Sequence, residues 1–150
     1  MSYRGMNSTL STDHARALVR AMPEMSPWDN AKSNHQEDNM NRSSDYTETV
    51  EIVAGVARLL HRAGSARGHS FAEMYLATGA SLASQHALEL LPDDVDPTEG
   101  PWPVESAAGE LIRAAEELLR QAPLHANDLV PGVPGLVAEV CGLVRDCKAA

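Results

Sequence analysis

Three ionisable side chains beside one predicted turn are of the types that bind metal ions. His61 lies near the end of a predicted helix, and His69 and Glu73 stand four residues apart at the start of the next one. Neutral imidazole and carboxylate are ordinary zinc ligands. A single His-x-x-x-Glu spacing is a weak signal, and a two-metal site in a helical bundle needs Glu-x-x-His motifs that this sequence lacks. We therefore expect Glu73 to cap its helix, and we predict no metal site and no cofactor.

A second place for chemistry is the predicted helix that contains His86. Its middle, residues 77–84, consists almost entirely of small residues, which let a neighbouring helix approach closely or leave room for a ligand. Close packing is the preferred interpretation, because no nucleophile or substrate group lies near His86 in the sequence. The alternative is a small-molecule pocket lined by Tyr75, Gly79, Ala83 and His86.

Other catalytic patterns are incomplete. Glu48 and Glu51 form one acidic pair, but a magnesium site between two helices needs a second pair, which the following helix does not provide. There is no Gly-x-Ser-x-Gly motif, and the glycine-bounded stretch at 64–68 lacks the lysine of a phosphate-binding loop. We assign no catalytic residues. An enzyme would have to depend on the His and Glu side chains named above.

Charge and composition limit the partners. The formal net charge is −9, with 21 Asp and Glu against 12 Lys and Arg, which opposes binding to nucleic acids or anionic membranes. The most apolar window, 129–144, is interrupted by Pro and Gly and is too short to span a bilayer. We therefore expect a protein partner or a second copy, with no nucleic acid and no membrane, and with a small molecule as a further possibility.

The two cysteines and the first residues predict a cytoplasmic location. Cys141 and Cys147 are six residues apart on one predicted helix, about 9 Å along its axis, so they cannot form a disulfide there. The first 14 residues contain no apolar stretch of the secretory type. Only two of the 12 basic residues are lysines, and with frequent alanine this composition suggests a bacterial source.

The elements that position these residues are all predicted helices. Apolar side chains recur at helical spacing in four segments, and we find no alternating pattern typical of strands. Ser70 and Glu73 form a Ser-x-x-Glu capping box, and Pro103 suits the first turn of another helix. The predicted fold is all-α, with an antiparallel four-helix bundle-like core at about residues 45–147, from helices at 45–63, 70–91, 103–122 and 134–147.

The first 44 residues are predicted to lie outside this core. A short helix is expected at 11–22, and residues 24–44 are rich in Asn and Ser and are interpreted as a polar linker or loop. The expected organisation is an N-terminal helix with a linker over 1–44 and a helical bundle domain over 45–150.

The function that this pattern favours is interaction without catalysis. Bundles that lack catalytic motifs often act as binding modules. We expect a helical interaction or regulatory protein that associates with itself or with another protein through the broadly apolar helices at 45–63 and 134–147. The predicted interface residues are Val53, Leu60, Val140 and Val144. A ligand-binding bundle and a His/Glu-dependent enzyme remain the alternatives.

Overall fold

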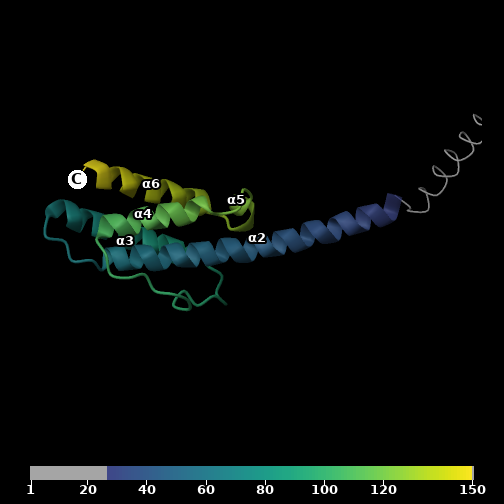
Figure 1. Ribbon diagram of the computed structural model, residues 1–150, viewed down its shortest axis with the longest axis horizontal. Helices are drawn as coiled ribbons and strands as arrows, with labels where there is room; N and C mark the ends of the chain where they lie inside the picture. Colours follow the sequence, from purple (N-terminus) through teal and green to yellow (C-terminus); the bar gives the residue numbers. More distant parts are fainter. Residues whose placement is uncertain (1–26, 150) are drawn as a thin grey trace, which may run out of the picture. The chain divides into compact units, whose positions relative to one another are not determined.

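A computed structural model describes residues 27–149, which form five helices and no strand (Figure 1). The helices are α2 (Pro27–Gly64), α3 (Phe71–Leu90), α4 (Ala108–Arg120), α5 (Ala126–Leu129) and α6 (Val133–Ala149). The chain divides into two units, Met1–Asn41 and Arg42–Ala150. The predicted all-α bundle is confirmed within the second unit, whereas the helix predicted at 11–22 lies outside the described residues.

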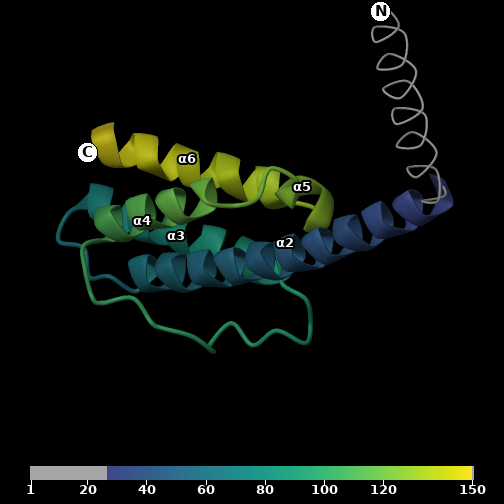
Figure 2. The ribbon, with the colours of Figure 1, turned by 45° about the vertical axis from the view of Figure 1, so that its right-hand side comes forward.

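The core of the second unit is built from small and branched apolar side chains. Leu60 of α2, Ala80 of α3, Ile112 of α4 and Leu136 of α6 are all fully buried in it. α6 packs against both α3 and α4, and α2, α3, α4 and α6 lie side by side in the two ribbon views (Figures 1 and 2). Burying these side chains is the main driving force for folding, as in other globular domains.

The direction of the helices differs from a simple up-and-down bundle. Glu73 near the start of α3, Ala108 at the start of α4 and Cys147 near the end of α6 line one cavity. α3 and α4 are therefore parallel, whereas α2 and α6 run the other way (Figure 2). Residues 91–107 make the return between α3 and α4. At up to about 3.5 Å per residue this segment easily spans the roughly 30 Å length of α3.

Two predicted boundaries are wrong. The polar stretch at 24–44 is helical from Pro27 onward, as part of α2. The apolar residues in the later part of α2 stabilise the helix by packing on the core. The polar stretch contains no Gly or Pro after Pro27, so no helix-breaking residue interrupts the helix there. α4 begins at Ala108 instead of Pro103, with Ala107 as an N-cap without a side-chain hydrogen bond. Val104 is consequently exposed outside the helix, and the connection before α4 is longer than expected.

The beginning of α3 is confirmed as predicted. Ser70 Oγ accepts a hydrogen bond from the backbone N–H of Glu73, and the Glu73 side chain accepts one from the backbone N–H of Ser70. This reciprocal pairing satisfies two of the free N–H groups at a helix start. It fixes the residue at which α3 begins, and therefore the direction in which each of its side chains points.

Candidate functional site

The outward side of α3 carries large apolar side chains. Phe71 is 85 % exposed, Leu82 is 63 % exposed, and Met74 and Tyr75 are each 60 % exposed. With the exposed Thr78 between them, they follow the 3–4 residue spacing that places side chains on one side of a helix. We call Phe71, Met74, Tyr75, Thr78 and Leu82 the α3 outer face. It extends over about 16 Å of the helix.

The opposite side of α3 carries small side chains that face the core. Its buried residues are Leu76, Ala77, Ala80, Ala83, Ser84 and Ala87. They allow α2 to approach closely: Ser84 Oγ donates a 3.1 Å hydrogen bond to the Ala57 carbonyl oxygen, and a Cβ on Gly64 would lie only 2.9 Å from the Ser81 Cβ. Except for Leu76, α3 therefore buries small residues and leaves most of its large apolar residues exposed.

The four residues of the predicted small-molecule pocket do not enclose a common cavity within the described chain. Tyr75 belongs to the α3 outer face. Gly79 lies against Leu143 of α6, and Ala83 is buried in the core. His86 is half-buried, and its Nδ1 lies 3.0 Å from Glu139 Oε1 of α6. Packing between helices occupies the space that a ligand would have needed.

The predicted interface residues lie inside the bundle. Val53 and Leu60 of α2 and Val140 and Val144 of α6 are all buried in the core of their own chain. A partner cannot reach these side chains while the bundle is folded. Large apolar side chains that are open to solvent lie elsewhere: several share α3, and others are on α2 and in the connections between helices.

The possible metal ligands are engaged separately. Glu73 Oε2 accepts hydrogen bonds from the backbone N–H groups of His69, at 2.6 Å, and Ser70, at 3.1 Å, and these bonds lower the pKa of Glu73. His61 instead lies edge-on to Trp102, with ring centroids 6.0 Å apart. Residues 27–149 contain no group of three His, Cys, Asp or Glu side chains placed to hold a metal ion.

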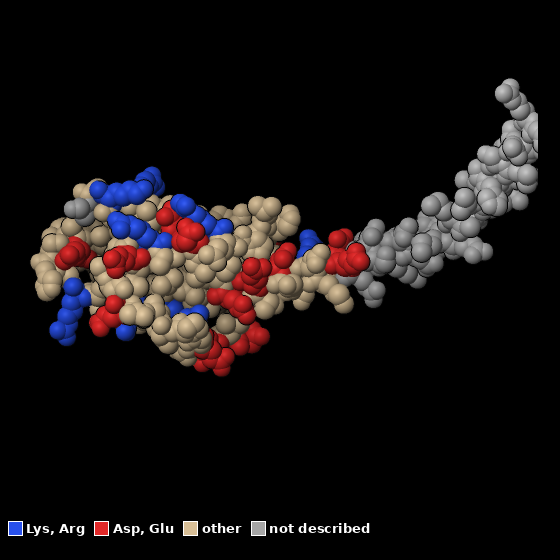
Figure 3. Space-filling model, viewed as in Figure 1, with Lys and Arg blue, Asp and Glu red and all other residues tan. Residues whose placement is uncertain are grey.

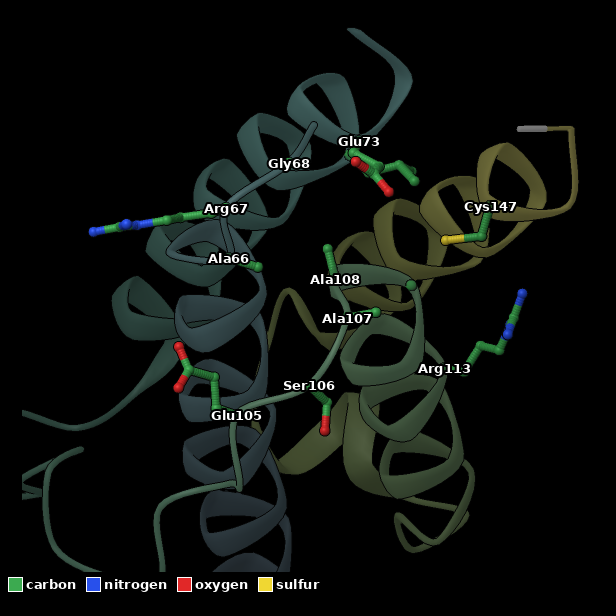
Figure 4. Close-up of a pocket in the computed structure, with 12 residues that line it drawn as sticks. Ala66, Arg67, Gly68, Glu73, Glu105, Ser106, Ala107, Ala108, Arg113 and Cys147 are labelled. Carbon is green, nitrogen blue, oxygen red and sulfur yellow. The ribbon is translucent and has the colours of Figure 1, made fainter. Parts of the chain in front are cut away.

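A cavity of about 440 Å³ lies at the end of the bundle where α3 and α4 begin (Figure 4). The side chains of Arg67 and Arg113 extend away from it. A Cβ on Gly109 would lie 3.6 Å from Cys147 Sγ, so the thiol lies beside the first turn of α4. Burial raises the pKa of the Cys147 thiol, which favours its protonated form. The cavity lining also includes the Glu105 carboxylate, the Ser106 hydroxyl and the Glu73 carboxylate, which is already engaged by backbone N–H groups.

The long connection over 91–107 is attached to α2 by one arginine. Arg58 donates hydrogen bonds to the carbonyl oxygens of Pro97, at 3.1 Å, and Glu99, at 2.8 Å. Trp102 and Leu88 line a small cavity of about 170 Å³ under the segment. These contacts hold the connection in place. His61, Ser84 and Thr98 also line this cavity, and Ser84 Oγ already donates its hydrogen bond to the Ala57 carbonyl oxygen.

Charge is separated on the surface drawn in Figure 3. Basic side chains gather over α4 and α6, and acidic ones along the connection over 91–107, where Asp93, Asp94, Asp96 and Glu99 are exposed.

Within the described residues, none of the helices combines the length and the apolarity needed to cross a bilayer.

Comparisons with known proteins assign no family. No protein-family model matches the chain, and no curated protein or solved structure is similar enough to count as a match. The α3 outer face is thus the feature on which a functional argument can be based. Of its residues, only Tyr75 is among the predicted site residues, although the spacing of positions 71, 74, 75, 78 and 82 is readable in the sequence.

Proposed function

We propose that this chain is a non-catalytic helical interaction protein that binds another protein surface through the α3 outer face. The observation that carries this proposal is the exposure of four large apolar side chains on one side of α3, opposite a side that is already buried. A helix that is apolar on both sides is typical of one packed on both sides. Contiguous apolar patches on a monomer often mark binding sites.

The binding free energy available from this face is substantial. Full burial of one large apolar side chain is worth about 1.5–3 kcal/mol. Phe71 and Tyr75 are aromatic, and residues of this kind dominate interface energetics. Even after the losses of translational and side-chain freedom on association, four such side chains support specific binding of a complementary apolar surface.

The alternative functions have less support. A ligand pocket at Tyr75, Gly79, Ala83 and His86 would need space that Leu143 and the neighbouring helices fill. An enzyme would need a base in contact with a nucleophile or metal, whereas the Glu73 carboxylate is held by backbone N–H groups and the His86 imidazole by Glu139. Binding through an exposed apolar helix face requires neither a ligand cavity nor a catalytic base.

Site-specific photo-cross-linking tests the proposal. A photoreactive benzoyl-phenylalanine replaces Leu82 in one variant and Leu124 in a matched control, because Leu124 is 97 % exposed but lies between α4 and α5. We expect protein adducts in cells from position 82 and none from position 124. Adding Met74→Asp to the first variant is expected to abolish the adducts. Equal adducts at both positions, or none at either, would contradict the proposal.

A further inference from the structure

We propose that the cavity beneath the connection over 91–107 binds a small molecule that carries one aromatic ring and a carboxylate. The cavity has a volume of about 170 Å³ and is lined by residues of α2, α3 and the connection. An apolar cavity of roughly 150 Å³ holds benzene, so this one has room for a single ring. The inference goes beyond the proposed function and does not depend on it, because no residue of the α3 outer face lines the cavity.

The walls of the cavity are apolar and suit a flat ring. Ala57 of α2 is buried, whereas Leu88 of α3 and Trp102 of the connection are exposed, so a ligand can enter from solvent. The ring planes of His61 and Trp102 meet at 69°, so His61 does not stack on the indole ring. An aromatic ligand can pack on this indole ring in the offset or edge-on geometry that such pairs prefer.

The polar lining of the cavity contains no carboxylate. Although the chain has 21 Asp and Glu, the ionisable side chains that line the cavity are Arg58 and His61. The two lining hydroxyl groups, those of Ser84 and Thr98, already donate hydrogen bonds within the chain. A ligand carboxylate would therefore meet a guanidinium and an imidazole, with no like charge in the lining.

Arg58 has hydrogen-bonding capacity that the chain itself does not use. Its Nη1 donates to the carbonyl oxygens of Pro97 and Glu99, but its Nε is buried without a hydrogen-bond partner among the described residues. Within residues 27–149, Arg58 also forms no ion pair with a carboxylate. A buried N–H group without an acceptor is costly, and a carboxylate is the acceptor that matches a guanidinium best. A ligand carboxylate beside Arg58 would supply both the acceptor and the opposite charge.

The acidic side chains of the connection face another cavity. Asp94, Asp96 and Glu99 line it together with Glu51 of α2, and Arg58 is the residue that it shares with the proposed site. Arg58 therefore stands between these carboxylates and the ligand. Its positive charge offsets their repulsion of a bound carboxylate.

Protein-observed NMR tests the site with benzoate, and with benzyl alcohol as a neutral compound of the same size. The chain has two tryptophans, so Trp102 gives one of two indole N–H signals and Trp28 gives the internal control. At constant ionic strength, we expect benzoate to shift the Trp102 signal with a dissociation constant on the order of 1 mM, about tenfold below that of benzyl alcohol. A Trp102 signal that benzoate leaves unchanged, equal shifts of both signals, or equal affinity for the two compounds would overturn the inference.

Two arginine variants test the contact with the carboxylate. Arg58→Gln is expected to weaken benzoate binding about tenfold and to change benzyl alcohol binding by less than about twofold, because Gln removes the charge and keeps a donor for the connection. Arg62→Gln lies one turn further along α2, outside the cavity lining, and as the matched control should change neither. Equal losses for the two compounds in Arg58→Gln, or equal losses of benzoate in the two variants, would overturn the inference.

Two variants of the connection test the aromatic wall. Trp102→Ala is expected to weaken both compounds about tenfold, and Val104→Ala, at another exposed position of the connection, to leave both unchanged. Saturation-transfer NMR measures binding from the ligand signals, and circular dichroism should show the same helix content in all four variants. Unchanged binding in Trp102→Ala would place the ligand elsewhere on the chain and overturn the inference. Photo-cross-linking at Leu82 is a separate measurement, so the inference and the proposed function can fail independently.

Discussion

α3 and α4 lie in the same bundle and use their apolar residues in opposite ways. α4 buries Leu111, Ile112, Ala115 and Leu119 and exposes charged side chains such as Arg113 and Glu117. α3 buries mainly alanine and exposes Phe71, Met74, Tyr75 and Leu82. α4 is therefore an ordinary surface helix whose apolar side faces the core of its own chain. α3 still exposes large apolar side chains after it has packed on that core, which is why we propose the binding surface there.

The largest expected effect comes from exchanging a large apolar residue for alanine on each helix. Ile112→Ala is expected to lower the free energy of unfolding by about 2–5 kcal/mol, because it leaves a cavity in the core. Leu82→Ala should change it by no more than about 0.5 kcal/mol, since Leu82 is exposed in the single chain. Urea unfolding measures both free energies. Equal losses would mean that the α3 outer face packs within the folded chain.

A smaller effect is expected from enlarging the inner side of α3. Ala80 is fully buried where the helices approach closely, so Ala80→Leu is expected to lower the free energy of unfolding by about 1–3 kcal/mol through overpacking. Ala72→Leu makes the same change at an exposed position of α3 and serves as the control. Thermal unfolding distinguishes them; a neutral Ala80→Leu would show that the inner side is not close-packed.

The smallest expected effect concerns the start of α3 and depends on pH. Backbone hydrogen bonds lower the pKa of Glu73 in the folded chain, so its stabilisation is present above the ordinary glutamate pKa and is lost as the pH falls through the lowered value. Glu73→Gln should therefore be less stable than wild type at about pH 7, and the difference should shrink toward about pH 3.

Urea midpoints at the two pH values give this comparison for Glu73→Gln. Glu105→Gln, an exposed carboxylate outside the helices, is the control and should show no such convergence with wild type. A Glu73→Gln difference that is the same at both pH values would contradict the role of the ionised carboxylate in the capping box.

Local signals made the helices predictable. The Ser70–Glu73 capping box predicted the start of α3 to within one residue, because its hydrogen bonds involve only neighbouring residues. The periodic apolar residues of α4 and α6 likewise predicted helices where they occur. α2 was predicted too short because its first part is polar, and polar composition alone does not distinguish a linker from the extension of a stable helix.

The candidate site was harder to predict, because exposure depends on neighbours that are distant in sequence. Val53 and Val140 look like interface residues when helices are considered singly, and the bundle buries them. Leu82 looks like a core residue, and the core lies on the other side of its helix. The small residues Gly79 and Ala83 suggest a pocket in the sequence, but in the structure the Leu143 side chain of α6 packs against Gly79.

The sequence by itself determined that the chain is helical, where most of its helices lie and how α3 begins, since these depend on side-chain spacing and on hydrogen bonds within a few residues. Only the tertiary structure decided that α3 and α4 are parallel and that α3 turns its alanines inward. The physical reason is that close packing of α2 and α6 against α3 leaves room mainly for small side chains. Phe71, Met74, Tyr75 and Leu82 are therefore left on the outside, where another protein surface can bury them.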